Sequence, residues 1–462
     1  MTHQQRIVRG SILNPSPDGR VTFYPDGALL AGQDGRIVFA GDWNELKPQL
    51  GSSEYTITQA DEIITPPFLD CHTHIPQFPI RGHFTDGLPD HLKDGRLLAG
   101  LERNVFPQEG RCESEEYATE VVRDFAASTL SQGVIGGAAY MTVHRGATQA
   151  ALRELSREWS VGLVLMNQHC PPYLRTQLPI LENDICTLAD EFGRRLIVTD
   201  RFAVSVDTSL RRRGVALAEK LGLRMQTHLN EQRAEKALVE KVLYPNYHSY
   251  TDVYRRDGLL DCSPLMAHCI QMRSEEWQML ARDGVAVAHC PTSNTLLGSG
   301  TMPLDKMSGY GVPYALCTDV GASPTTSMLA EMAQFLKVHQ GRSTLATPSA
   351  ALFHATLAPA QILGLDRDIG SFEIGKMLSW IEIATTSADL SRKTADEVIR
   401  TELLGSPSIS GLEKDLDDLA ITGLDHGDAL CRLKEDVNLT ADILNAKVLR
   451  VSLSGNTVWE RK

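Results

Sequence analysis

Eight short apolar runs between residues 63 and 320 constrain the fold of this chain more than any other feature. They read IITPPFLDCHTH, GVIGGAAY, VGLVLMNQ, RLIVTDRF, LRMQTHL, PLMAHC, VAVAHCPTSN and VPYALCTDV. Longer amphipathic stretches separate most of them, such as residues 115–131, 209–221, 231–242 and 274–283. Buried strands that alternate with helices predict an α/β fold with a parallel sheet, either a (β/α)8 TIM-like barrel or a doubly wound sheet. Polar residues at the carboxyl-terminal ends of several runs favour the barrel, because barrel enzymes build their active sites there.

The two ends of the chain have a different pattern. In residues 1–65, short apolar runs are separated by the turn dipeptides DG at 18, 26 and 34. Residues 446–459 read as a hairpin around SGN, which can join the N-terminal strands. We therefore expect a small β-sandwich domain built from both chain ends.

The predicted domain boundaries follow from these patterns. Residues 1–65 form the first part of the β domain, residues 66–383 the (β/α)8 barrel, and residues 384–462 an insertion plus the strands that complete the β domain. Within the polar segment 384–445, DEVIRTELL and LEKDLDDLA are candidate helices.

Composition excludes some classes of protein. The formal net charge of −13 argues against nucleic acid as a partner, because phosphate binding needs clustered Lys and Arg. No signal peptide and no apolar stretch of the roughly 20 residues needed to cross a bilayer is visible in the sequence. The nine cysteines include no CxxC pair and are not a disulfide framework, so we expect a cytoplasmic protein without a membrane partner.

Five side chains at predicted strand ends indicate a metal site. His72 and His74 end the first run, His228 the fifth, His268 the sixth and Asp319 the eighth. Two histidines one residue apart on a strand point to the same side. Imidazoles with a carboxylate suit zinc or a similar divalent metal, and the prediction depends on all five positions coinciding. Three further histidines are expected to be structural: His144, His169 and His289.

Glu231 is the candidate general acid and base. It follows His228 by three residues, where the chain turns into the next predicted helix. A metal lowers the pKa of bound water to about 7, and a nearby carboxylate can take the water proton and deliver it to the leaving group. The alternative role is a first-turn carboxylate that the helix dipole stabilises. Asp319 has two expected roles, binding the metal and orienting the water.

The spaced motifs HTH, THLNE, MAHC, AHCPTSN and CTDVGAS resemble the mononuclear deaminase branch of the amidohydrolase superfamily. The resemblance covers roughly residues 60–375 in the same order. Within that branch, HTHIPQF, NVFPQE and THLNEQRAEKALVEKVLYPNYHSYTDVYRRDGLL are similar to segments of the guanine deaminase family.

That resemblance implies roles for particular residues. His72, His74, His228 and Asp319 would bind one Zn²⁺ (or Fe²⁺) per subunit, His268 would touch the metal water or the substrate, and Glu231 would shuttle protons. Gln77 and Arg201 would hydrogen-bond a small heterocyclic substrate, and Phe202 would stack on it.

The implied reaction is hydrolysis of a C–N bond of a cyclic amidine, guanine to xanthine plus ammonia, as a step of purine catabolism in a homodimer. The chemistry of the three substrate residues agrees, because an amide donates and accepts, an arginine donates to a carbonyl, and a phenyl ring offers an apolar face. Without the resemblance, Arg201 and Phe202 would read as an exposed ion-pair residue beside a core aromatic.

Several segments depart from the family pattern. Asp200 replaces an expected proline before Arg201 and is a possible ion-pair partner for that arginine. The residues FPIR at 78–81 replace a Tyr and small residues at the pocket rim, and LSW follows GKM near residue 378. These departures affect the prediction of which substrate is bound more than the prediction of a hydrolytic reaction.

Three alternative functions stay open at this point. The same machinery can act on another heterocycle, such as an oxidised purine, a pterin or an s-triazine, as a deaminase or a chlorohydrolase. A non-catalytic assembly protein on the same barrel would lack ligands, and none is missing here. The zinc deaminases with an HxE and PCxxC signature are a third class, and this chain lacks that signature.

Overall fold

The computed structural model describes residues 5–51, 55–89, 92, 95–405 and 426–461, with the side chains of 426–432 left out of the description. Its larger part is a parallel eight-stranded sheet in the order β12-β11-β10-β9-β8-β7-β6-β5. The strands are β5 (Phe68–His74), β6 (Val134–Tyr140), β7 (Trp159–Leu165), β8 (Leu196–Asp200), β9 (Arg224–Leu229), β10 (Leu265–His268), β11 (Ala286–His289) and β12 (Tyr314–Leu316). Each lies in one of the eight predicted runs, except that β7 begins two residues before its run, so the predicted barrel is confirmed.

Backbone hydrogen bonds just beyond β12 close the barrel onto β5. The N–H of Asp319 donates to the carbonyl of His72 at 2.8 Å, and the N–H of His74 donates to the carbonyl of Val320 at 3.2 Å. The eight strands therefore form a nearly closed barrel, and this closure sets Asp319 beside the His72–His74 pair.

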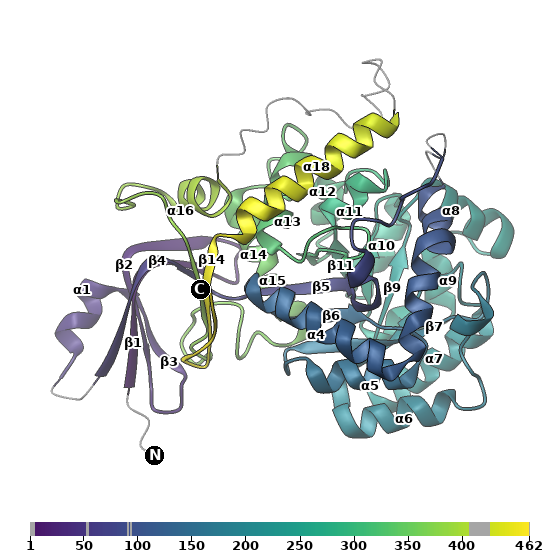
Figure 1. Ribbon diagram of the computed structural model, residues 1–462, viewed down its shortest axis with the longest axis horizontal. Helices are drawn as coiled ribbons and strands as arrows, with labels where there is room; N and C mark the ends of the chain where they lie inside the picture. Colours follow the sequence, from purple (N-terminus) through teal and green to yellow (C-terminus); the bar gives the residue numbers. More distant parts are fainter. Residues whose placement is uncertain (1–4, 52–54, 90–91, 93–94, 406–425, 462) are drawn as a thin grey trace.

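Helices surround the barrel strands in Figure 1. The helices between β5 and β9 include α4 (Glu115–Ser131), α5 (Arg145–Glu154), α6 (Leu181–Phe192) and α7 (Thr208–Leu221). Between β9 and β12 lie α8 (Arg233–Leu238), α9 (Tyr250–Arg256), α10 (Ser274–Arg282), α11 (Pro291–Leu296) and α12 (Leu304–Gly309). After β12 come α13 (Met328–His339), α14 (Pro348–Ala355) and α15 (Leu357–Leu363).

Local capping explains where these helices begin and end. The Ser114 side chain accepts from the Tyr117 N–H at the start of α4, and the Asp207 side chain accepts from the Leu210 N–H at the start of α7. The α7 helix ends at Gly222, which adopts φ 63°, a left-handed conformation that glycine takes without strain. The predicted helices at 115–131, 209–221 and 274–283 are confirmed to within a residue.

The small domain is one continuous seven-stranded sheet in the order β15-β14-β13-β4-β1-β2-β3. Its strands are β1 (Gln5–Pro15), β2 (Val21–Ala31), β3 (Ile37–Asp42), β4 (Tyr55–Thr65), β13 (Trp380–Ile383), β14 (Val448–Leu453) and β15 (Asn456–Glu460). Both chain ends contribute, as predicted, although a single hydrogen-bonded sheet takes the place of the two sheets of a sandwich. The short helix α1 (Trp43–Leu46) follows β3.

One strand lies inside the range 66–383 predicted for the barrel, at its carboxyl end. The run WIEI at 380–383 is fully buried, so in sequence it resembles a barrel strand. In the structure it is β13, which pairs antiparallel with β4 and with β14. The barrel elements therefore end with α15, and β13 belongs to the small sheet.

The polar segment 384–445 is partly helical, because residues 384–394 form no helix and helices begin at Ala395 and His426. DEVIRTELL forms α16 (Ala395–Val398) and the turn that follows it, whereas LEKDLDDLA lies outside the described residues. The long helix α18 (His426–Asn445) packs against α13 on the barrel. No described helix is long and apolar enough to span a lipid bilayer.

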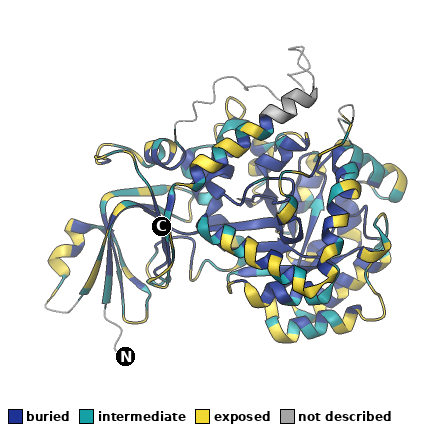
Figure 2. Cartoon of the chain, in the orientation of Figure 1, coloured by how far each residue is buried: buried dark blue, intermediate teal, exposed yellow. Residues whose placement is uncertain are grey.

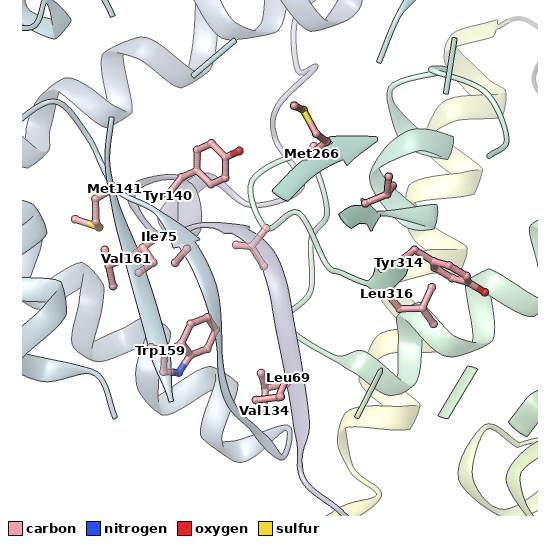
Figure 3. Packing of buried hydrophobic residues seen from close by; sticks show 14 of the residues in the cluster. Leu69, Ile75, Val134, Tyr140, Met141, Trp159, Val161, Met266, Tyr314 and Leu316 are labelled. Atoms are coloured by element: carbon pink, nitrogen blue, oxygen red, sulfur yellow. The ribbon is translucent and has the colours of Figure 1, made fainter. Parts of the chain in front are cut away.

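The main apolar core lies between the barrel strands and the surrounding helices. Figure 3 shows part of it, with Leu69, Val134 and Trp159 from the first three barrel strands in one group and Tyr314 and Leu316 from β12 in another. In Figure 2 the strands are dark blue along most of their length, and exposed residues lie on the outer faces of the helices. This packing holds the strand ends, and the polar side chains on them, in fixed positions.

Candidate metal centre and substrate pocket

The five predicted strand-end residues come together at the carboxyl end of the barrel. The Nε2 atoms of His72 and His74 each lie 3.3 Å from the same carboxylate oxygen of Asp319. The Nε2 atoms of His74 and His228 are 3.2 Å apart. The ligand atoms of His72, His228 and His268 lie within 4.8 Å of one another, as do those of His72, His74 and Asp319.

Hydrogen bonds on the far side of two imidazoles orient them toward this centre. His228 Nδ1 donates to the backbone carbonyl of Arg201 at 2.6 Å, which leaves the Nε2 lone pair facing the cluster. His268 Nδ1 lies 2.9 Å from the amide oxygen of Asn294, an acceptor that fixes the same tautomer. Such partners behind a ring are typical of metal-binding histidines.

The donor set fits a divalent cation. Burial lowers the pKa of His72, lowers that of His74 to about 4, and holds that of His228 well below its usual range. The imidazoles are therefore neutral at pH 7, as metal ligands must be. His72 Nε2 is buried without a hydrogen-bond partner among the described residues, and ring nitrogens face each other where a cation would relieve the contact. The chemistry and spacing of these residues therefore fit a site for a divalent cation.

The backbone is strained at two of these positions. His268 has φ 71° and Asp319 has φ 53°, both in the left-handed region that residues with a Cβ seldom adopt. His268 is the last residue of β10, and Asp319 lies three residues after the end of β12, so the backbone turns at both positions where the side chain reaches the centre. Strain of this kind gathers at functional sites.

Glu231 lies beside the same centre and is fully buried. Its Oε1 accepts from the Ser299 hydroxyl at 3.0 Å, and its Oε2 is 3.6 Å from His268 Nε2. Burial, reinforced by the negative charge of Asp319, raises the pKa of the Glu231 carboxyl to about 8. A carboxyl group with a pKa near neutrality can both take and give a proton at pH 7.

Glu235, and not Glu231, is the carboxylate that caps the start of the next helix. The helix α8 begins at Arg233, and Glu235 is the residue whose Oε2 accepts from the N–H groups of Glu231 and Gln232, at 2.9 and 3.1 Å. Glu231 itself points to the cluster, because its partners are Ser299 and His268.

A pocket opens onto the cluster. Its polar wall includes His74, His228, Glu231, His268, Asp319, Gln77 and Arg201, and its apolar wall Phe84, Leu97, Leu101, Phe202, Leu297 and Ala322. The three predicted substrate-binding residues therefore line the same pocket as the metal site. The Phe202 ring meets the His228 imidazole edge to face, with centroids 6.3 Å apart.

Glu109 holds two of these pocket residues and was not singled out from the sequence. Its carboxylate accepts from Arg201 Nη1 at 2.8 and 2.7 Å and from the side-chain amide of Gln77 at 2.8 Å, and all three side chains are buried. The Gln77 NH₂ group donates to the Glu109 carboxylate. The other polar atom of the Gln77 side chain, Oε1, has no hydrogen-bond partner among the described residues and is free to accept from a ligand. The NVFPQE motif, which ends in Glu109, contained the only signal for this residue.

Asp200 does not pair with Arg201. The Asp200 carboxylate accepts from Arg211 Nε at 2.7 Å, and Asp257 accepts from Arg211 Nη1 at 2.8 Å. All three side chains are fully buried. Adjacent residues on a strand point to opposite faces, so Asp200 faces helix α7 while Arg201 turns into the pocket. The ion pair between Asp200 and Arg201 that the sequence suggested is therefore not formed.

His289 ends β11 but lies outside the cluster. Its Nε2 is 3.1 Å from Nε2 of His339 on α13, and its ring contacts Phe335 of the same helix. It therefore faces outward to the helix layer, in line with the structural role expected for it.

The fold and the site together define a class of protein. The model of the Amidohydrolase family matches residues 63–415, and the chain belongs to that family. It is a hydrolase built on the barrel with a second sheet from the chain ends.

Individual relatives share this architecture. The chain is 30% identical over 417 residues to guanine deaminase of Escherichia coli strain K12, an alignment that covers 86% of this chain and 92% of that protein. It is also 30% identical over 405 residues to guanine deaminase of Rattus norvegicus, covering 84% and 85%. The solved structure of E. coli guanine deaminase superposes with a TM-score of 0.77 at 26% identity and covers 100% of both chains.

Proposed function

We propose that this protein deaminates guanine hydrolytically, giving xanthine and ammonia. One observation carries the proposal: the histidine–aspartate cluster, Glu231 and the Glu109-held pair of Gln77 and Arg201 all face one pocket. The similarity to guanine deaminases along most of the chain supports this substrate.

The pocket residues suit the edge of a guanine ring. Arg201 has only donors and suits the guanine carbonyl oxygen. Gln77 offers its free Oε1 as an acceptor for a ring N–H, because Glu109 occupies its NH₂. Phe202 supplies an apolar face for the plane of the ring. In this arrangement the amino-bearing carbon is directed toward Glu231 and the metal site.

The metal would be held by His72, His74, His228 and Asp319, and when bound it supplies a water molecule activated at neutral pH. Glu231 would take a proton from the attacking water as the water oxygen bonds to the amino-bearing carbon, and would deliver that proton to the adjacent ring nitrogen. A second proton passes through Glu231 to the departing amine, so that guanine and water become xanthine and ammonia. Asp319 would also orient the water, and His268 would contact the water or the substrate.

We extend the proposal to the metal and the setting of the enzyme. Nitrogen donors with one carboxylate favour Zn²⁺, one ion per subunit, with Fe²⁺ as the second choice. The barrel carries the catalytic residues, and the β domain is its support. A cytoplasmic homodimer agrees with the free cysteines of the described chain and with the family resemblance.

The test is ammonia release by the purified protein against guanine, another oxidised purine, a pterin and an s-triazine. We expect guanine to have the highest kcat/KM. A panel in which a pterin or triazine is turned over faster than guanine would overturn the substrate while leaving the hydrolytic chemistry intact.

A further inference from the structure

A second cavity lies at the other end of the barrel from the metal site. Its wall includes Arg224, Ala286 and Tyr314, the first residues of β9, β11 and β12, and Pro264, which precedes β10. Its volume is about 880 Å³, within the range of small-molecule binding pockets. The proposed function makes no use of this cavity.

Small side chains on the barrel interior leave room for it. A buried cluster in the barrel interior includes Cys71, Ala138, Ile197, Cys290 and Cys317, and its members on β10, β11 and β12 are Leu265, Ala267, Ala286, Ala288 and Ala315. Four of these five are alanines, which fill little of the interior above the strand starts. Space therefore remains where larger residues would close the base of the barrel.

Arg224 brings a positive charge into this space without a protein partner. It stands at the start of β9, two and four residues before Gln226 and His228, so it shares their inward-facing side. The guanidinium makes no ion pair and no hydrogen bond with any described residue, and burial lowers its pKa. A partly desolvated cation with no counter-charge is costly unless something binds it.

The other titratable groups in the wall do not neutralise Arg224. Asp18 is bound by Arg20 and by the Ser16 hydroxyl within its own turn. His354 donates from Nδ1 to the carbonyl of Tyr314 at 2.8 Å, and burial lowers its pKa to about 4, so it is neutral. Arg224 is thus the one unpaired charge among the described lining residues.

The rest of the wall suits a flat ring. Tyr314 and His354 stack with centroids 3.6 Å apart and 18° between their planes. Phe353, Pro313 and Ile362 extend the apolar surface next to them. A ring held on this surface could direct an anionic group to the guanidinium, which binds carboxylates and phosphates with paired hydrogen bonds.

We propose that this cavity is a binding site for a small organic anion that carries an aromatic ring, with Arg224 pairing the anionic group. The site is separate from the guanine pocket, so the proposal stands whatever heterocycle is hydrolysed there.

The experiment is calorimetric titration of the purified full-length protein with benzoate, with its neutral isostere benzamide and with inorganic phosphate. Benzoate is expected to bind more tightly than either of the others, because it alone has both the ring and the charge. Arg224→Gln should weaken benzoate binding by about tenfold or more, the effect of losing a charged hydrogen bond. Arg282→Gln is the matched control, since Arg282 is exposed, paired with Asp283, and close in sequence to Gly284 of the cavity wall.

Stability gives a second readout. Arg224→Gln removes an unpaired charge, so without ligand its melting temperature should equal or exceed that of the parent, whereas benzoate should raise only the parent's. If Arg224→Gln does not fold, Ala286→Leu fills the cavity without altering the charge and should abolish benzoate binding. The proposal is overturned if benzoate does not bind at about 10 mM, or if benzamide or phosphate binds as tightly as benzoate. It is also overturned if Arg224→Gln, or Ala286→Leu in its place, binds benzoate with the affinity of the parent.

Discussion

Both carboxylate oxygens of Glu109 accept from Nη1 of Arg201, at 2.8 and 2.7 Å, in a buried ion pair at the wall of the substrate pocket. We expect Glu109→Gln to lower kcat/KM for guanine by about 10²-fold, because the substrate contacts of Arg201 lose their fixed position. The change should also cost roughly 3 kcal/mol of stability, since it leaves a buried cation unpaired. Steady-state kinetics and chemical denaturation measure the two effects. Glu154→Gln, which breaks the exposed pair with Arg123, should change neither, and equal effects from the two variants would contradict the assignment.

Glu231→Gln tests the proton shuttle. The amide keeps the size and the hydrogen bond to Ser299 but cannot carry a proton. We expect kcat to fall by about 10²–10⁴-fold while the metal content stays that of the parent. Metal analysis and single-turnover kinetics check this, with the exposed Glu116→Gln as control. Near-normal turnover by Glu231→Gln would remove Glu231 from the role.

Metal removal tests the histidine–aspartate cluster. Dialysis against a chelator should abolish ammonia release, and added Zn²⁺ should restore it. The stripped protein should also melt at a lower temperature, because a ligand that binds only the folded state stabilises it. Activity that survives a verified loss of metal would refute a metal-dependent mechanism.

Arg211 offers a test of buried charge away from the pocket. It bridges Asp200 and Asp257, and all three side chains are fully buried. Arg211→Met should destabilise the fold by about 3–5 kcal/mol, because the buried Asp200 carboxylate loses its counter-charge and Asp257 keeps only the exposed Arg212. The neighbouring Arg212→Met is the control, since Arg212 contacts the same Asp257 from a largely exposed position. Denaturation midpoints that shift equally for both variants would contradict this account.

Glu402 should make stability depend on pH at the acid end. Burial by itself would raise the pKa of the Glu402 carboxyl. Hydrogen bonds from Lys393, Ser387 and Thr385 outweigh this effect and hold the pKa well below the usual value of 4.5. A pKa lowered in the folded state contributes stability above the unfolded pKa, and this is lost as pH falls through the folded one. The gap in melting temperature between the parent and Glu402→Gln should therefore be full at pH 6 and shrink below about pH 4. A gap that stays constant down to pH 3 would refute the coupling.

The sequence alone determined the barrel and the centre of the candidate site. Strand periodicity is a local property, and His72, His74, His228, His268 and Asp319 could be placed at strand ends without coordinates. Once strands close into a barrel, their ends must converge, so the cluster followed from the pattern.

Only the tertiary structure decided which side chains pair across the pocket. Glu109 lies 92 residues from its partner Arg201 in the chain. Asp200 forms its ion pair with Arg211 and not with the adjacent Arg201. The unpaired Arg224 and the outward-facing His289 also depend on how helices and strand starts pack. Hydrophobic patterning reports which residues are buried, whereas the partner of a buried charge is set by distances between segments that no local pattern contains.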